Sequence, residues 1–309
     1  MDGALIVDKP AGMTSHDVVA RVRKIVGTRR VGHTGTLDPF ATGVLVVLVG
    51  KATRLMQFLS ASEKEYWAVI RLGYATDTGD ITGRPMPSQP GAPAADCLGR
   101  EQIESAIASF RGEIEQVPPM YSAKKIKGQK LYELARRGEQ IERQAARVKI
   151  TTFELVETGG AFRKVNDDAT CDVTVRVVCS AGTYVRTLAE DLGTRLGSAA
   201  HLAELRRTRA GNFEIEDAST LERLMKLAEA NSLNDVIISP DDMLSHFPVM
   251  QLSVDEARRV LNGIDIQCGS NFENQQHVRL HDEGGRLITV GLYDGTKCTV
   301  HPKVVLLNS

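Results

Sequence analysis

The hydrophobic positions near the amino terminus follow two different periods. Residues 5–7 and 44–49 are uninterrupted apolar runs, which are typical of short strands buried on both faces. Between them, the apolar residues of 18–26 recur at helical spacing, and Thr14 or Ser15 can cap the first turn of that helix. The pattern therefore predicts helices and strands in alternation from the start of the chain.

The central part of the chain predicts a sheet. Residues 66–73, 148–156 and 171–179 have the β-branched and aromatic composition of strands. We expect the last two to be neighbours in one antiparallel sheet, and we expect a helix over 101–110. The fold class indicated is α+β, with a mixed sheet that is mostly antiparallel.

The end of the chain has a different pattern. A predicted helix at 254–261 is followed by short strands between glycine turns, at 278–280, 287–293 and 304–306. This is typical of a small β-rich module. At 309 residues the chain is long enough for a large domain and a small one, which we expect over 1–247 and 248–309.

Composition narrows the class of protein. Hydrophobic residues make up 42% and charged residues 25%, near the averages for soluble globular proteins, and no apolar run is long enough to span a membrane. The first residues lack the basic and apolar regions of a secretory signal, which predicts a cytoplasmic protein. The five cysteines are scattered without a CxxC pair, which argues against a disulfide framework and a zinc site. We expect no bound metal.

The formal net charge of −1 conceals an uneven distribution. Residues 1–59 carry eight Lys and Arg against four Asp and Glu, and residues 111–150 carry ten against five, whereas 212–247 carry two against eight. A polyanion could therefore bind one face of the protein, although ordinary solvated helix faces would give the same counts. A basic ribbon that could grip a phosphate backbone comprises Lys124, Lys125, Lys127 and Lys130.

The loop over residues 32–43 is the best candidate for chemistry. It has no hydrophobic periodicity and leads directly into the buried strand. Asp38 precedes Pro39, which biases the Asp38 backbone away from helical φ and ψ and fixes the direction of its carboxylate. This suits a presented acid. The alternative is that Asp38 only starts a turn, which is a common role of Asp before Pro.

Residues 180–187 predict a strand that turns through Gly182 into a helix, with Tyr184 and Arg186 in the first helical turn. A cation at this end of a helix opposes the helix dipole. Arg186 therefore either pairs with a carboxylate or is simply a solvated arginine.

Five ordered segments resemble the TruB family of tRNA pseudouridine-55 synthases, and the match spans most of the chain. These are residues 8–17, 32–43, 64–66 with 77–80, 117–123 with the basic ribbon, and 180–187. The resemblance implies a pseudouridine synthase fold over 1–247, with an RNA-binding thumb at about 121–150. It implies a PUA-like RNA-binding domain over 248–309. Residues 85–99 are unlike the compact members and have no functional interpretation.

The resemblance implies a reaction that breaks the bond from C1′ to N1 of uridine, rotates the uracil and rejoins it through C5. No cofactor is needed. Asp38 takes the place of the catalytic acid and either attacks C1′ or promotes elimination through C2′, with Arg186 as its partner. Tyr66 stacks on the flipped uracil and takes the C5 proton.

The same resemblance implies four substrate-binding residues, namely His33, Tyr184, Leu205 and Lys9. Tyr184 and Leu205 are expected as walls of the pocket, and His33 as the residue that holds the rearranged RNA loop. The alternatives are structural: Tyr66 and Leu205 as ordinary core residues, and His33 as a turn histidine.

The implied partner is the T arm of tRNA. We expect the protein to act as a monomer, with no attachment to a membrane and no guide RNA or protein partner. Two alternatives remain open at this point. One is a dyskerin-like, guide-dependent synthase, against which the predicted thumb argues. The other is a non-catalytic tRNA-binding chaperone.

Overall fold

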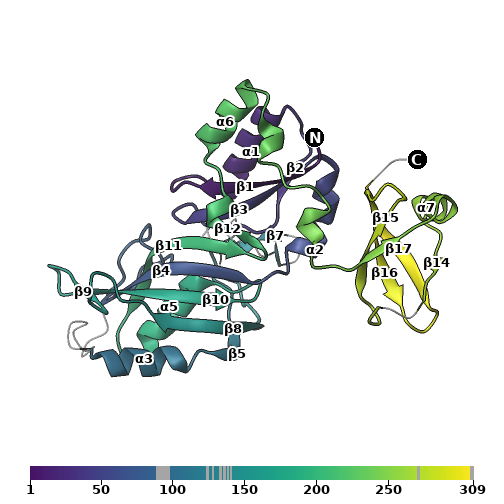
Figure 1. Ribbon diagram of the computed structural model, residues 1–309. Helices are drawn as coiled ribbons and strands as arrows, with labels where there is room; N and C mark the ends of the chain where they lie inside the picture. Colours follow the sequence, from purple (N-terminus) through teal and green to yellow (C-terminus); the bar gives the residue numbers. More distant parts are fainter. Residues whose placement is uncertain are drawn as a thin grey trace.

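The computed structural model describes residues 1–87, 98–122, 125–126, 129–131, 134, 137, 139, 141–269 and 272–306. Its main sheet runs in the order β1 (Gly3–Lys9), β3 (Thr42–Val49), β11 (Ala200–Ala210), β4 (Lys64–Leu72), β10 (Cys171–Cys179), β8 (Ala146–Leu155) and β5 (Gly112–Gln116). The neighbouring pairs of this path are antiparallel except β3 and β11, which pair in parallel. The predicted α+β class with a mostly antiparallel mixed sheet is confirmed (Figure 1).

The predicted pairing of the two central strands is confirmed. In the β8 and β10 ladder, Val177 lies opposite Phe153, and both side chains are buried. Strand β4 lies on the other side of β10, and its burial alternates along the strand because successive side chains point to opposite faces. Tyr66 is on the buried face of β4, which is the face that contributes to the functional site.

The parallel contact of β3 with β11 is short and close. Gly43 lies opposite Arg207, and a Cβ on Gly43 would be 2.2 Å from the Arg207 carbonyl oxygen. Gly43 also has φ +100°, a conformation that residues with a Cβ rarely adopt. Only glycine fits here, and it allows the end of the 32–43 loop to lie directly against β11.

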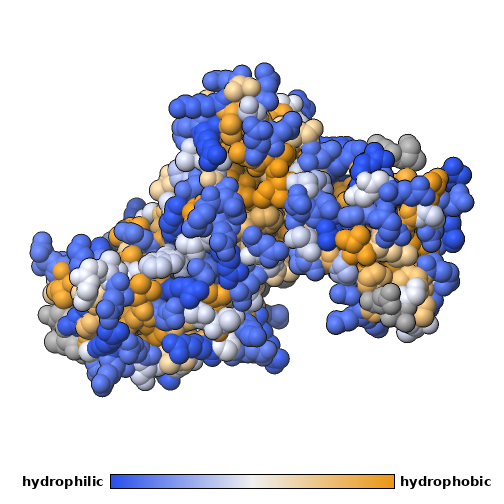
Figure 2. All heavy atoms as spheres, viewed as in Figure 1, coloured by the Kyte–Doolittle hydropathy of each residue, from blue (hydrophilic) through white to orange (hydrophobic). Residues whose placement is uncertain are grey.

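Helices α1 (Ser15–Val26) and α6 (Leu221–Glu229) pack together on the β1 and β3 end of the sheet (Figure 1). Thr14 caps α1 in a reciprocal capping box with Asp17, and Gly27 ends the helix at φ +67°. In the view of Figure 2, hydrophobic residues gather in the body of this lobe and hydrophilic residues cover most of the outer edges. The lobe therefore gives the catalytic loop a rigid support.

Helices α3 (Arg100–Ala108) and α5 (Val185–Arg195) cover one face of the β4, β10 and β8 part of the sheet (Figure 1). Their apolar residues belong to the same core as Ile70, Phe153 and Leu202. The remaining short elements are β2 (Val31–His33), η1 (Gly50–Leu55), α2 (Met56–Leu59), β6 (Lys125–Ile126), β7 (Gln129–Lys130), β9 (Lys164–Val165), β12 (Phe213–Glu214), η3 (Ile215–Asp217), η4 (Leu233–Asp235) and η5 (Asp242–Leu244).

The predicted β-rich module at the end of the chain is confirmed. It contains β13 (Val249–Gln251), α7 (Val254–Leu261), β14 (Ile266–Gln267), β15 (His277–His281), β16 (Leu287–Asp294) and β17 (Thr299–Val305). These strands form a second sheet with its own apolar core. Asp241, which precedes the module, accepts from Arg279 at 2.9 Å and contacts His281 at 2.8 Å. An ion-pair cluster thus joins the module to the rest of the chain.

No helix in the described part of the chain has the length and apolar character that crossing a membrane requires.

Candidate active site

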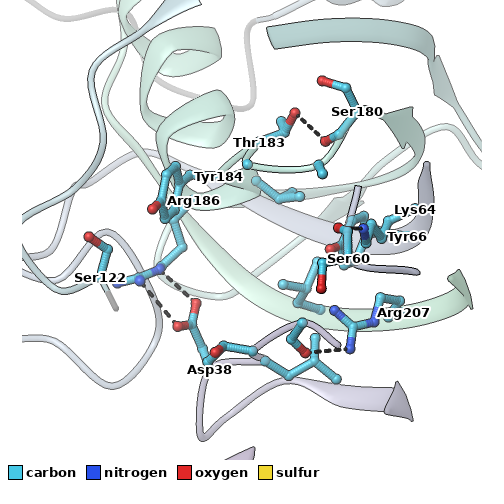
Figure 3. A pocket seen from close by; sticks show the side chains of 17 residues that line it. Asp38, Ser60, Lys64, Tyr66, Ser122, Ser180, Thr183, Tyr184, Arg186 and Arg207 are labelled. Atoms are coloured by element: carbon cyan, nitrogen blue, oxygen red, sulfur yellow. Dashed lines mark hydrogen bonds and ion pairs between the residues drawn. The ribbon is translucent and has the colours of Figure 1, made fainter. Parts of the chain in front are cut away.

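A cavity of about 250 Å³ opens where the 32–43 loop, β4, β11 and the start of α5 meet (Figure 3). This volume is several times the ~30 Å³ that one water molecule occupies in the liquid, so the cavity has room for more than a single water molecule. The cavity is lined by Gly35, Thr36, Leu37, Asp38, Ser60, Lys64, Tyr66, Ser122, Ser180, Ala181, Gly182, Thr183, Tyr184, Val185, Arg186, Leu205 and Arg207.

Asp38 and Arg186 form an ion pair at one end of this cavity (Figure 3). Arg186 Nε is 2.9 Å from Asp38 Oδ2, and Nη2 is 3.2 Å from Oδ1, so two parallel bonds join the groups. The Arg186 side chain is 4% exposed, whereas the Asp38 side chain is 30% exposed and faces the cavity. The predicted carboxylate partner of Arg186 is confirmed, and the solvated alternative is wrong.

The backbone holds Arg186 in place. Gly182, at φ +85°, turns the chain out of β10, and α5 then begins directly after Tyr184. Arg186 donates to the carbonyl oxygens of Thr78, at 3.0 Å, and Tyr121. The guanidinium is therefore fixed by loops from both sides before any substrate arrives.

A second carboxylate, Asp80, also faces Arg186, with Oδ2 3.5 Å from Nη1. Asp80 is almost fully buried and accepts bonds from Thr78 and Thr82. Asp80 is not among the site residues predicted from the sequence. Its signal is its place in the 77–80 segment that resembles the TruB family.

Burial raises the pKa of Asp38, while the positive charge of Arg186 lowers it and the neighbouring Asp80 raises it. The ion pair thus opposes the cost of placing a carboxylate among protein atoms. Burial is the largest of these effects, so the pKa of Asp38 lies above its ordinary value, and the two bonds from Arg186 hold the carboxyl oxygens in a fixed direction at the cavity wall.

Tyr66 and Leu205 lie side by side on the sheet that forms the cavity floor. Tyr66 is on β4 and Leu205 on the neighbouring β11, and each is 8% exposed. Both side chains belong to the main core and also line the cavity, and the substrate contacts expected of them stay predictions. The apolar faces of the two side chains offer a surface for a stacked base.

Tyr184 forms another wall and is positioned by Gln116. The Gln116 amide accepts from the Tyr184 backbone N–H at 2.8 Å and donates to the Tyr184 carbonyl oxygen at 3.0 Å. Burial raises the pKa of the Tyr184 phenol, and a hydrogen bond with Ser122 lowers it. Tyr184 therefore stands neutral beside the ion pair.

Lys9 and His33 lie outside the cavity lining. Lys9 is fully buried, and its Nζ donates to the carbonyl oxygens of Met13 at 2.6 Å, Pro10 at 2.9 Å and Pro39 at 3.2 Å. Burial lowers the pKa of Lys9 to about 8. Since Pro39 follows Asp38, Lys9 holds the catalytic loop. Substrate contact by Lys9 stays a prediction.

His33 stands edge-on to His16, with ring centroids 5.5 Å apart. Burial lowers the pKa of His33 to about 4, so the ring is neutral near pH 7. Its Nδ1 is buried without a hydrogen-bond partner in the structure. The RNA-loop contact predicted for His33 stays a prediction.

Two family models match the chain along the region that builds this site. Residues 23–185 match the N-terminal domain of the TruB family pseudouridylate synthases, and residues 186–245 match the C-terminal domain of tRNA pseudouridylate synthase B. The chain belongs to the TruB family. This confirms the family that the sequence motifs resemble, and with it the pseudouridine synthase activity, an isomerase reaction.

Curated TruB relatives cover most of the chain. This chain is 50% identical over 270 residues to tRNA pseudouridine synthase B of Thermobifida fusca, and the match covers 85% of each protein. It is 47% identical over 276 residues to the Geobacter sulfurreducens protein of the same name, covering 89% of this chain and 85% of that protein. Among solved structures, a chain of a Cbf5–Nop10–Gar1 complex has a TM-score of 0.73 and 27% identity, covering 99% of this chain and 85% of that one.

The TruB cavity also contains two cations that the sequence analysis missed, Lys64 and Arg207. Lys64 donates to the carbonyl oxygens of Ser60, at 2.8 Å, and Ser62. Burial and the neighbouring Arg207 lower the pKa of Lys64 to about 8. Lys64 lies in the 64–66 segment that resembles the TruB family, and Arg207 lies in a strand with two other arginines, Arg206 and Arg209, a pattern that many solvated strands share.

The basic ribbon falls largely outside the described residues. Lys124 and Lys127 lie outside them altogether, and for Lys125 and Lys130 only the strand backbone is described. Residues 88–97 of the predicted insertion also lie outside. In the part of this TruB chain that is described, no group of three or more His, Cys, Asp or Glu side chains could hold a metal ion.

Proposed function

We propose that this chain isomerises the T-loop uridine of tRNA at position 55 to pseudouridine, with Asp38 as the essential group. One observation carries the proposal: the Asp38–Arg186 ion pair stands at the wall of a cavity whose floor holds Tyr66. The pair presents an anionic oxygen to a nucleotide, and the tyrosine ring offers a stacking surface beside it.

The reaction begins when the uridine leaves the RNA stack and enters the cavity, at a cost of a few kcal/mol that stacking on Tyr66 offsets by roughly 1–3 kcal/mol. Asp38 then attacks C1′, or removes a proton from C2′, and the bond from C1′ to N1 breaks. The detached uracil turns and C5 bonds to C1′, which breaks the bond from Asp38 to C1′ in the first route and returns the proton from Asp38 to C2′ in the second. Finally the Tyr66 phenolate takes the C5 proton, the electron pair of the C5–H bond restores the C5=C6 double bond, and N1 takes up a proton from water.

We assign catalysis to residues 1–247 and RNA binding to the thumb at about 121–150 and to the PUA-like module over 248–309. The proposed substrate contact is the T arm, bound by a monomer. The basic ribbon suits a phosphate backbone by charge. The cytoplasmic location stays a prediction.

A guide-dependent synthase is the less favoured alternative. Solved Cbf5 complexes share 25–27% identity with this chain, whereas the curated tRNA enzymes share 40–50%. The non-catalytic chaperone is less favoured because a chaperone has no need of a carboxylate held by a buried arginine at a cavity wall.

The test is tritium release from C5-labelled uridine in an unmodified tRNA transcript. We expect release with the wild-type protein, and none with Asp38→Asn or with a transcript whose T-loop uridine is replaced by cytidine. Release from the cytidine transcript would place the reaction at another uridine. Tight RNA binding without any release would favour the chaperone, and release that requires an added guide RNA would favour the guided synthase.

A further inference from the structure

Arg207 lies on the cavity floor, and the proposed chemistry of Asp38 and Arg186 gives it no task. It is on β11, directly opposite Tyr66 of β4 in the antiparallel ladder. Residues in such register have Cβ atoms about 4.5–5.5 Å apart and side chains on the same face of the sheet. Arg207 is 2% exposed and lines the cavity beside Tyr66 (Figure 3).

Two backbone carbonyl groups hold the Arg207 guanidinium. Nε donates to the Val44 oxygen at 2.7 Å, and Nη2 donates to the Gly35 oxygen at 3.1 Å. Gly35 lies three residues before Asp38 in the catalytic loop, and Val44 is in β3. These two bonds use Nε and Nη2, and Nη1 is the remaining nitrogen of the guanidinium. One planar side chain thus touches the Asp38 loop and stands beside the Tyr66 phenol.

The charges around the Tyr66 phenol come from three neighbouring elements. Burial raises the pKa of Tyr66, and Cys179 of β10 and Asp38 of the loop raise it further; Arg207 lowers it by its charge and by hydrogen bonding. Lys64, two residues earlier on β4, is also near and feels the charge of Arg207. Among the groups that shift the pKa of Tyr66, Arg207 is therefore the one that favours a negative phenolic oxygen.

We propose that Arg207 is a positioning residue for the last proton transfer, which pairs with the Tyr66 phenolate oxygen and fixes its place relative to the Asp38 loop. The inference rests on the proposed function. After C5 has bonded to C1′, the phenolate takes the C5 proton and becomes a phenol. The C5–H electron pair restores the C5=C6 bond, the electron pair of the C6=N1 bond returns to N1, which takes up a proton from water, and the phenol later returns its proton to water.

The planar guanidinium group explains why an arginine suits position 207. Arginine can donate in two directions from one rigid plane, whereas a lysine ammonium is a compact charge on a flexible stem. A positioning role for Arg207 differs from a purely structural one in its consequence. Substitution of Arg207 must then change the proton-transfer step, and not only the stability of the loop that carries Asp38.

The experiment compares wild type, Arg207→Gln, Arg207→Lys and Arg206→Gln in single-turnover reactions on tRNA. Arg206 is the matched control because it lies next in the strand and pairs with Asp8 at 2.8 Å, outside the cavity lining. Each protein is tested with C5-protiated and C5-deuterated uridine between pH 6 and 10. RNA affinity and thermal unfolding are measured in parallel.

We expect Arg207→Gln to be slower by about 100-fold near pH 7, within the range of general acid–base effects. Its deuterium isotope effect should exceed that of the wild type, and its rate should continue to rise at a higher pH, because forming the phenolate needs more base without the cation. Arg207→Lys should show smaller shifts in the same directions, and it carries the test if Arg207→Gln does not fold. Arg206→Gln should match the wild type.

The proposal is overturned if the Arg207 variants keep the isotope effect and the pH profile of the wild type, whatever their reaction rate. Arg207 is then a structural residue. The wild-type reaction separates this result from a failure of the proposed function. If wild type releases no tritium from tRNA, the proposed function itself is wrong. If wild type is active and the Arg207 variants keep its profile, only the role of Arg207 is wrong.

Discussion

Arg186 reaches Asp38 across 148 positions of sequence, with Nε 2.9 Å from Oδ2 and Nη2 3.2 Å from Oδ1. The arginine is buried and the carboxylate faces the cavity. The geometry gives the enzyme a carboxylate held in a fixed direction at the cavity wall, and Arg186 opposes the rise that burial causes in the pKa of Asp38.

Asp38→Asn is expected to reduce pseudouridine formation by at least about 1,000-fold, because the amide is neither a nucleophile nor a base. The measurement is single-turnover tritium release with a parallel assay of RNA affinity, which should change little. Asp172→Asn is the matched control, since it removes an arginine-bound carboxylate, 2.7 Å from Arg71, that lies outside the cavity lining. Substantial turnover by Asp38→Asn would contradict the assignment.

Arg186→Met is expected to lower the free energy of unfolding by about 3–5 kcal/mol, because it leaves Asp38 and Asp80 without their buried cation. Urea unfolding at pH 7 measures this difference. Arg71→Met should cost less, since the Arg71 side chain is 24% exposed, against 4% for Arg186. Equal stability of Arg186→Met and wild type would mean that the ion pair does not support the fold.

Tyr66→Phe should keep the RNA affinity of the wild type and slow tritium release by about 100-fold or more. The phenyl ring preserves the stacking surface, but it has no oxygen to accept the C5 proton. The assay compares the dissociation constant for tRNA with the single-turnover rate. If affinity and rate fall by the same factor, the proton-transfer role of Tyr66 is wrong.

Stability should depend on pH through His33. Its pKa is about 4 in the folded protein against 6.5 for an ordinary histidine, so the unfolded chain binds more protons between these values. The free energy of unfolding therefore falls as the pH falls from about 6.5 to 4. His33→Gln should flatten this part of the profile in urea titrations. A profile as steep as that of the wild type would show that His33 does not become charged on unfolding.

The C-terminal module should depend on Asp241 for its placement. Asp241→Asn weakens the contacts to Arg279 and His281, and we expect about tenfold weaker binding of whole tRNA with unchanged turnover of an isolated T-arm stem-loop. Asp282→Asn is the control, because the Asp282 pair with Arg286 lies within the module. If Asp241→Asn weakens the reaction with whole tRNA and with the isolated stem-loop by the same factor, Asp241 acts on the catalytic domain instead.

Local patterns in the sequence determined the elements and the candidate acid. Thr14 and Gly27 bracket a helix because capping chemistry acts within a few residues, and Asp38 stands out because Pro39 restricts its backbone. The alternation in β4 likewise placed Tyr66 on a buried face. Each of these features depends on residues that are neighbours in the chain, so it can be predicted from a single sequence.

Tertiary structure alone decided which distant groups meet. The residue pattern alone left Arg186 either paired with a carboxylate or solvated, and the family resemblance implied Asp38 as its partner; packing makes that pair and adds Asp80. The parallel contact of β3 with β11 and the register of β11 on β4 brought Arg207 to Tyr66, and the same packing kept Lys9 and His33 out of the cavity lining. Strand order and register join residues that lie far apart in the chain, and hydrophobic periodicity does not encode which strands pair.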